Sequence, residues 1–70
     1  MDIAKKFSKR LKELRMDKNL TQTALAKECG ISQAGIAKWE TEDRMPSVEC
    51  LIILSKFFNC SIEYLLGLED

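Results

Sequence analysis

Histidine is absent from this 70-residue sequence, and its three cysteines are Cys29, Cys50 and Cys60. An odd number of widely spaced cysteines without histidine offers neither a set of zinc ligands nor a disulfide framework. We therefore expect buried, reduced thiols, no metal and no cofactor. The sequence also lacks a glycine-rich phosphate loop and a cysteine paired to a base, so it does not indicate an enzyme.

Long apolar segments are absent as well. The longest run, Cys50 to Leu54, is far shorter than the roughly 20 residues that span a bilayer, and Met1-Asp2-Ile3 does not open a signal peptide. We expect a soluble, cytoplasmic protein. With 46% hydrophobic and 31% charged residues and no low-complexity tract, residues 1–70 are predicted to form one ordered domain.

The sequence has no excess of either charge, since its formal net charge is zero and its pI is near 6.2. A neutral chain argues weakly against a nucleic-acid partner. The charges are unevenly distributed, however. Residues 1–18 hold seven basic and three acidic side chains, whereas residues 45–70 hold one and four. This asymmetry suits a protein that presents one face to a polyphosphate, and ordinary solvated helix faces fit it equally well.

The spacing of apolar residues predicts an all-α fold of five helices. The first helix runs to about Lys18, because an apolar stripe recurs at helical intervals at Ile3, Phe7, Leu11 and Leu14. Three more starts show a Ser or Thr N-cap between two apolar residues, at Thr21, Ser32 and Ser61. Another begins at Ser47, behind Pro46, and keeps a helical period until Asn59.

A very short turn separates the second and third predicted helices. They span about Thr21–Cys29 and Ser32–Glu42, so Gly30 and Ile31 alone precede the Ser32 cap. Gly30 suits the left-handed conformation that ends many helices. So tight a connection makes the helices cross steeply, as in a helix-turn-helix unit covering about residues 21–42.

The start of the third helix presents a short polar surface, formed by Ser32, Gln33, Ala34, Gly35 and Lys38. A helix fits the major groove of DNA, where a side-chain amide pairs bidentately with adenine, so Gln33 is the predicted base reader. Ala34 offers a methyl group for thymine. Gly35 either lets the backbone approach the groove closely or reflects drift at an exposed site.

Gln22 follows the Thr21 cap, in the first turn of the second helix. Free N–H groups and the positive end of the helix dipole favour a phosphate there. We expect Gln22 to position the domain on DNA and not to read its sequence, and we expect Thr21 to belong to the same DNA-binding surface. The alternative is a glutamine that is simply tolerated in a first helical turn.

The chain from Leu20 to Leu66 resembles the lambda-repressor-like, or xenobiotic-response-element, family of helix-turn-helix regulators. The matching stretches read LTQTALAKECGISQAGIAKWE and RMPSVECLIILSKFFNCSIEYLL. The resemblance implies a bacterial or phage-encoded, nucleoid-associated transcriptional regulator, most simply a repressor. It also implies a homodimer, at least on DNA, bound to a pseudo-palindromic double-stranded operator.

The resemblance further assigns roles to residues outside the turn. Thr41 and Arg44 fall in the loop that grips the sugar-phosphate backbone in relatives, although Glu42 and Asp43 replace the glycine and bases common there. Arg15 occupies the position that in some relatives pairs with an acid equivalent to Glu40, joining the first helix to the third. The alternative for Arg15 is a solvated base. Trp39 is expected in the core, because an aromatic residue at helical spacing from buried residues usually packs inside.

The fourth helix carries more apolar residues than one buried stripe needs. Ile53 and Phe57 fall on a second face, and Tyr64 and Leu68 are expected to extend it. The favoured interpretation is a twofold dimer interface. Alternatively, Ile53 and Phe57 pack on the first helix. A different function class also fits this surface: a protein-interaction module, such as an antitoxin-like or regulatory adaptor.

Overall fold

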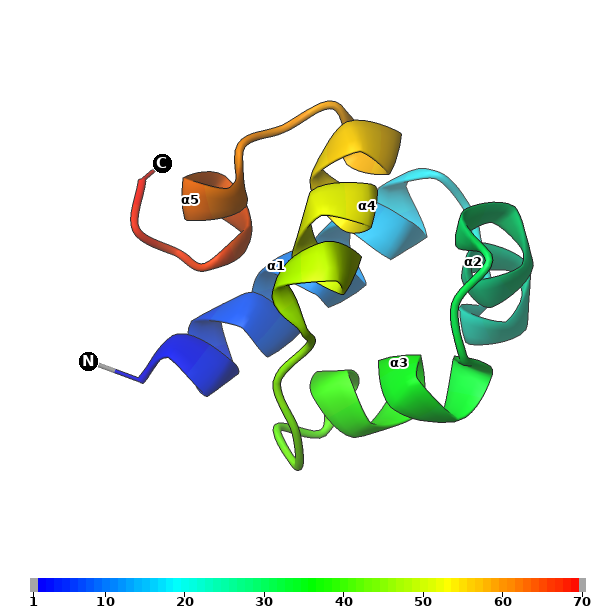
Figure 1. The fold of residues 1–70 in the computed structure, drawn as a ribbon, viewed down its shortest axis with the longest axis horizontal. Coiled ribbons are helices and arrows are strands. Elements are labelled where there is room, and N and C mark those ends of the chain that lie inside the picture. The colour runs from blue at the N-terminus through cyan, green and yellow to red at the C-terminus, as the bar shows by residue number, and fades with distance from the viewer. Residues whose placement is uncertain (1, 70) are drawn as a thin grey trace.

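The computed structural model describes residues 2–69. In that range the chain forms five α-helices and no strand, which confirms the predicted all-α fold (Figure 1). The helices are α1 (Ile3–Asp17), α2 (Gln22–Cys29), α3 (Gln33–Glu40), α4 (Val48–Phe58) and α5 (Ile62–Leu65).

Each helix begins after a polar residue whose side chain accepts a hydrogen bond from the N–H of the third helical residue. The predicted caps do this, namely Thr21, Ser32, Ser47 and Ser61. Asp2 does the same for α1, accepting from the Lys5 N–H at 3.0 Å, although the apolar stripe gave no sign of this cap. These bonds satisfy amide groups that a helix start leaves free, so the starts are set locally.

The predicted third helix was two residues too long at its C-terminal end. Glu42 lies beyond the helix in the left-handed conformation, with φ at 67°, and the Asp43 N–H bonds back to the Lys38 carbonyl at 2.9 Å. This is a Schellman-type helix end, in which glycine usually takes the left-handed position. Because glutamate occupies that position here, the sequence did not reveal the stop.

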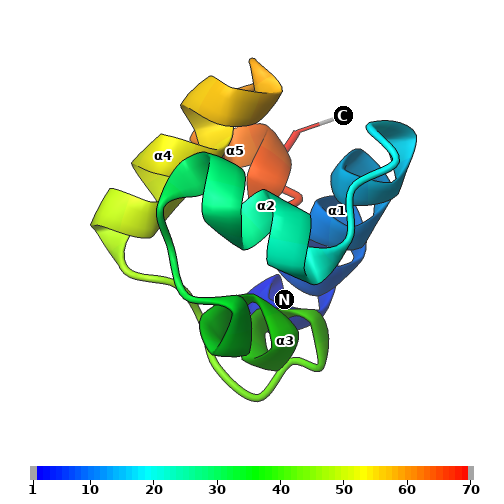
Figure 2. The ribbon, with the colours of Figure 1, turned by 90° about the vertical axis from the view of Figure 1, so that its right-hand side faces the viewer.

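The helices α2 and α3 lie at one edge of the fold. In Figure 1, α3 runs along the lower margin, far from α5, and α2 stands at the right. Figure 2 shows α2 crossing above α3 at a steep angle, with α1 on one side and α4 on the other. The main contacts of α3 are with α1 and α2, so its remaining face points away from the other helices.

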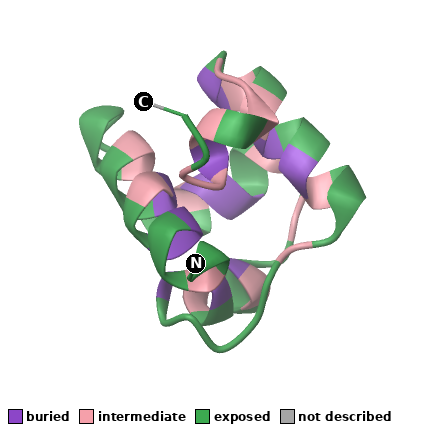
Figure 3. Cartoon of the chain, turned by 90° about the vertical axis from the view of Figure 1, so that its left-hand side faces the viewer, coloured by how far each residue is buried: buried purple, intermediate pink, exposed green. Residues whose placement is uncertain are grey.

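The core lies between the helices, and the buried residues face it from every helix (Figure 3). Its apolar members are Phe7, Leu11, Leu25, Ala26, Ile36, Trp39, Leu51, Leu54, Phe58 and Leu65. The Trp39 ring meets Phe7 edge to face, with centroids 6.3 Å apart. Trp39 is therefore a core residue that braces α3 against α1.

The cysteines are free, and each is half-buried instead of fully buried as expected. Burial raises the pKa of the Cys29 and Cys60 thiols, which keeps both protonated at neutral pH. Within residues 2–69, no helix is long and apolar enough to cross a membrane. The same residues bring together no group of three or more His, Cys, Asp or Glu side chains that could hold a metal ion.

Candidate nucleic-acid interface

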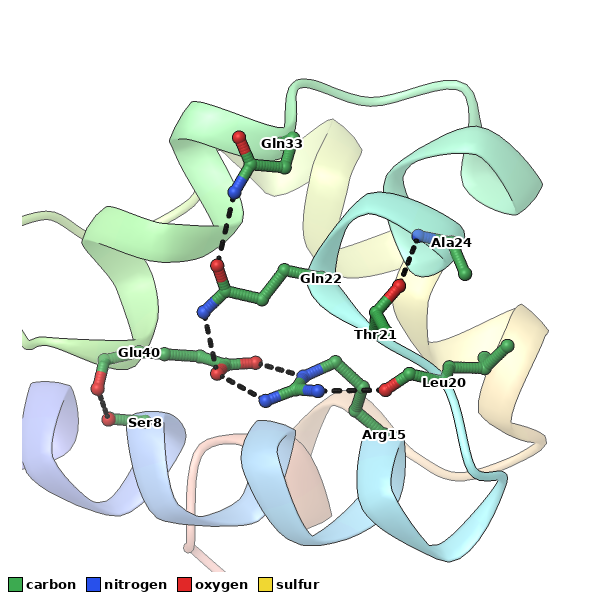
Figure 4. A network of polar contacts seen from close by, with 8 residues as sticks. All are labelled: Ser8, Arg15, Leu20, Thr21, Gln22, Ala24, Gln33 and Glu40. Carbon is green, nitrogen blue, oxygen red and sulfur yellow. Dashed lines mark hydrogen bonds and ion pairs between the residues drawn. The ribbon is translucent and has the colours of Figure 1, made fainter.

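The turn between α2 and α3 follows from the backbone conformation of Gly30. Gly30 ends α2 at φ 66°, and the following Ile31 N–H bonds to the Ala26 carbonyl at 3.0 Å. No atom lies within 4 Å of the place that a Gly30 Cβ would occupy, so the constraint is the left-handed backbone and not space. The turn brings the first turns of α2 and α3 onto one surface (Figure 4).

Four polar side chains form a chain of hydrogen bonds from α1 to α3, which we call the polar relay: Arg15, Glu40, Gln22 and Gln33 (Figure 4). Arg15 Nε and Nη2 donate to the two carboxylate oxygens of Glu40 at 2.7 and 2.8 Å. Gln22 Nε2 donates to Glu40 Oε1 at 3.1 Å. Gln33 Nε2 in turn donates to Gln22 Oε1, also at 3.1 Å. Spacing alone had not indicated this link between the two glutamines.

The carboxylate of Glu40 sets the direction of the relay. Because it only accepts hydrogen bonds, Gln22 must present its amino group to Glu40 and its oxygen to Gln33. Gln33 must then donate one N–H to Gln22. Gln33 is exposed, and the bond to Gln22 leaves its oxygen and its second N–H available for other partners.

The ion pair between Arg15 and Glu40 anchors the relay in the protein. Glu40 is 5% exposed, and Arg15 Nη1 also donates to the Leu20 carbonyl at 2.7 Å. Burial alone would raise the pKa of Glu40, but hydrogen bonds from Arg15 and Gln22 and the charges of Arg15 and Lys12 hold it below its usual range. The hydrogen bond to Glu40 raises the pKa of Arg15. Both groups are therefore charged at neutral pH.

The residues predicted to contact DNA from the third helix lie along α3, with Ser32 as its cap, Gln33, Ala34 and Gly35 in its first turn and Lys38 in its last turn. Ser32, Gln33, Ala34 and Lys38 are exposed, and Gly35 is half-buried. All of these except Gln33 line an open hollow of about 550 Å³ that also includes Arg44. The hollow is also lined by Trp39, which was expected in the core, and by four residues that the sequence had not indicated as site residues: Met45, Pro46, Ser47 and Cys50.

The loop after α3 separates two residues that were assigned the same role. Arg44 reaches the hollow, whereas the Thr41 hydroxyl lies 3.2 Å from the Ala37 and Lys38 carbonyls and from the Asp43 carboxylate. The Thr41 hydroxyl thus bonds within its own turn. Glu42 and Asp43, between the two residues, are exposed acids.

The apolar residues expected at a dimer interface differ in exposure. Ile53 and Leu68 are exposed, whereas Phe57 and Tyr64 are half-buried. A cation from α1 or its C-cap lies over each half-buried ring: Lys18 Nζ is 5.4 Å from the Phe57 centroid, and the Arg10 guanidinium is 4.0 Å from that of Tyr64. Phe57 also packs against the core, so Ile53 is the exposed one of the two α4 residues expected at the interface; Val48 and Ile52 on α4 are exposed as well.

The steep crossing of α2 and α3 and the exposed polar start of α3 define the helix-turn-helix class of DNA-binding proteins. A family model described as "Helix-turn-helix" matches residues 11–65, and the chain belongs to that family. The family consists of DNA-binding transcriptional regulators and is not a class of enzymes.

The proteins similar to this chain include two curated relatives and one solved structure. The "HTH-type transcriptional activator BcrR" of Enterococcus faecalis is 42% identical over 64 residues, covering 91% of this chain and 31% of that protein. "Repressor protein C2" of Salmonella phage P22 is 38% identical over 60 residues, covering 86% and 28%. The chain thus spans about a third of the length of these relatives. The restriction-modification controller protein C.AhdI of Aeromonas hydrophila superimposes with a TM-score of 0.79 at 29% identity, over 89% of this chain and 94% of that one.

Proposed function

We propose that this chain is a sequence-specific binder of double-stranded DNA that regulates transcription as a dimer on a pseudo-palindromic operator. The observation that carries the proposal is the polar relay, which fixes the exposed amide of Gln33 at the start of α3. A flexible glutamine loses side-chain entropy when it binds a base, whereas one held by Gln22 is already oriented.

The orientation of Gln33 matches adenine in the major groove. Adenine offers the N7 acceptor and the N6 donor, which pair with an amide N–H and an amide oxygen. The relay uses one N–H of Gln33 and leaves its other N–H and its oxygen for these two contacts. Ala34, exposed beside it, supplies a methyl group for a neighbouring thymine.

We assign the phosphate contacts to residues around Gln33. Gln22 donates one N–H to Glu40 and keeps the other for a phosphate near the first turn of α2, where Thr21 is exposed. Lys38 and Arg44 place two cations at the hollow beside α3. These contacts fix the register of α3 on the duplex without reading its sequence.

The proposal also covers the direction of regulation and the contact between the two protomers. A phage repressor and a transcriptional activator are both relatives. We propose repression, because occupying an operator excludes other proteins from it and needs no contact beyond those with DNA. A symmetric operator requires a self-complementary contact between protomers, which we assign to Ile53, Phe57, Tyr64 and Leu68. The proposed site of action is bacterial or phage DNA in the cytoplasm.

Selection of bound sequences from random duplex DNA tests this function. The wild-type chain should recover a symmetric site, and Gln33→Ala should lose discrimination at one or two base pairs per half-site, at a cost of about 1 to 3 kcal/mol. Lys38→Ala is the control, because removing a phosphate contact weakens all sequences evenly. Unchanged selectivity in Gln33→Ala would contradict the reading role.

The second candidate is a protein-interaction module that uses the apolar residues of α4 and α5. Ile53 and Leu68 are exposed and the net charge is zero, which is unusual for a protein that depends on phosphate contacts. If the selection enriches no DNA sequence, and if any binding of the chain to DNA does not weaken as salt rises, the protein-interaction module is favoured over the DNA-binding function.

A further inference from the structure

Three lysines line one face of α1, and we call them the lysine row: Lys5, Lys9 and Lys12. Their spacing of four and three residues places them along one side of the helix, and all three are exposed. With Ser8, Glu13, Met16 and Glu42 they line an open groove of about 300 Å³, so two acidic side chains share the groove with the three lysines. Within residues 2–69 no ion pair or side-chain hydrogen bond holds any of the three ammonium groups.

The groove lies beside the C-terminal end of the reading helix. The Ser8 hydroxyl donates to the Glu40 carbonyl at 2.7 Å, so the middle of the lysine row lies next to the last residue of α3. Lys12 is close enough to Glu40 for its charge to favour the ionised carboxylate. Figures 1 and 2 likewise show the N-terminal part of α1 next to the end of α3.

Charges of both signs meet at this edge of the molecule. The loop that follows α3 presents Glu42 and Asp43, and the C-terminal end of a helix is itself negative, so both oppose an approaching phosphate. The lysine row supplies three cations at the same edge. Lys5 and Lys12 are seven residues apart, which is about 10 Å along a helix, or about the rise of three nucleotides along the axis of a DNA duplex.

We propose that the lysine row binds backbone phosphates of the duplex that α3 reads, outside the base pairs that α3 contacts. This inference rests on the proposed function, since it requires that α3 faces DNA. The lysine row binds the DNA backbone beside the loop after α3, whose acidic side chains repel phosphates. This contact adds affinity without sequence preference. The positive charge of residues 1–18 thereby belongs to the binding surface and not only to a solvated helix.

The test compares the salt dependence of operator binding in two charge-matched variants. The first changes Lys5, Lys9 and Lys12 to Gln. The control changes three exposed lysines elsewhere: Lys6, which lies against Gly67, Lys27 in the last turn of α2, and Lys56 in the last turn of α4. Both variants lose the same charge, and circular dichroism verifies that both keep the helical fold.

Removing one phosphate contact makes the slope of log affinity against log salt shallower by about 0.9. The slope for the lysine-row variant should therefore be shallower by about 3 per bound protomer. Between about 50 and 200 mM salt, the affinity of wild type should then fall by a factor about 40 times larger than that of the variant for each bound protomer. The selected base preference of the variant should not change, and the control should keep the wild-type slope.

Two results would overturn the inference while leaving the proposed function intact. One is a wild-type slope in the lysine-row variant, and the other is an equal change in the control, which would indicate a general effect of net charge. A wild-type chain that selects no DNA sequence would overturn both the proposed function and the lysine row.

Discussion

Glu40 is the residue on which the polar relay depends, because its carboxylate holds Arg15 and orients Gln22. Glu40→Gln keeps the shape of the side chain but removes the negative charge that pairs with Arg15. We expect the free energy of unfolding at pH 7 to fall by about 3 kcal/mol, as when one partner of a buried ion pair is removed. Urea unfolding followed by circular dichroism measures this, with Glu63→Gln on the exposed side of α5 as the control.

The stability of the chain should also depend on pH through the ionisation of Glu40. The pKa of Glu40 is lower in the folded chain than its ordinary value of 4.5. Its stabilising contribution is therefore complete above about pH 4.5 and is lost as the pH falls through the lower, folded-state value. Wild type should lose stability in this range more steeply than Glu40→Gln. Parallel stability curves for the two proteins from pH 7 to about pH 3 would show that Glu40 is not stabilised as a carboxylate.

Glu42 is a residue in an unfavourable conformation. Its φ of 67° costs a side chain with a Cβ about 1 to 2 kcal/mol that glycine avoids. We expect Glu42→Gly to raise the free energy of unfolding by about 1 kcal/mol, measured by denaturant titration. Glu42→Gln separates the causes, because it removes the charge and keeps the strain. A gain in stability of the same size in the glutamine variant would assign the effect to charge repulsion.

At the scale of the helices, their starts could be predicted because each is a local event. The side chain of each cap accepts a hydrogen bond from the amide three residues ahead, and neighbouring apolar residues mark the start of the helix. These caps are Thr21, Ser32, Ser47 and Ser61. The end of α3 could not be predicted, since Glu42 does not favour the left-handed conformation it adopts. Backbone bonds from Glu42 and Asp43 to the carbonyls of Trp39 and Lys38 accompany this conformation, and a glutamate gives no sign of it in the sequence.

The candidate site was predictable as a set of residues but not as a connected network. The spacing of the turn places Gln33 outward, and the resemblance pairs Arg15 with Glu40. The bond between Gln22 and Gln33 joins residues eleven positions apart on different helices, and it exists only because of the angle at which α2 and α3 cross. No periodic pattern within one helix encodes that angle.

A substitution at Gly35 tests whether the backbone of α3 approaches DNA closely. A Cβ there would lie 3.5 Å from a Trp39 ring carbon, which is ordinary contact, so the fold tolerates alanine. Gly35→Ala should raise the free energy of unfolding by up to about 1 kcal/mol, because glycine is unfavourable within a helix. We expect affinity for the operator to fall at the same time, since the methyl group occupies space at the hollow that approaches DNA. Equal affinity for the two proteins, measured by fluorescence anisotropy, would show that the close approach is not used.

At the scale of the whole molecule, the proposed phosphate-binding cations and the apolar residues expected at the dimer interface lie in different regions. The cations of α1 and the hollow beside α3 lie near the proposed DNA face, whereas the exposed Ile53 and Leu68 lie on α4 and beyond α5. A dimer that buried the apolar residues would leave both α3 helices free to enter DNA. Self-association and DNA binding should therefore be separable by mutation.

Ile53→Asp is the change that separates them. Ile53 is 37% exposed on α4, so aspartate there should be tolerated by the folded monomer but should place a charge in the proposed interface. Phe57 is less suitable, because it packs against the core and its replacement would also unfold the chain.

Sedimentation velocity should show a lower association state for Ile53→Asp, and helical circular dichroism should match that of wild type. The matched control is Val48→Asp, on the same helix and 69% exposed, which should associate like wild type. On DNA, Ile53→Asp should bind a single half-site with the wild-type intrinsic affinity but lose most of the extra affinity of the two-half-site operator, because linked sites raise the effective concentration of the second protomer. If Ile53→Asp still fills both half-sites as tightly as wild type, the dimer contact lies elsewhere on the molecule.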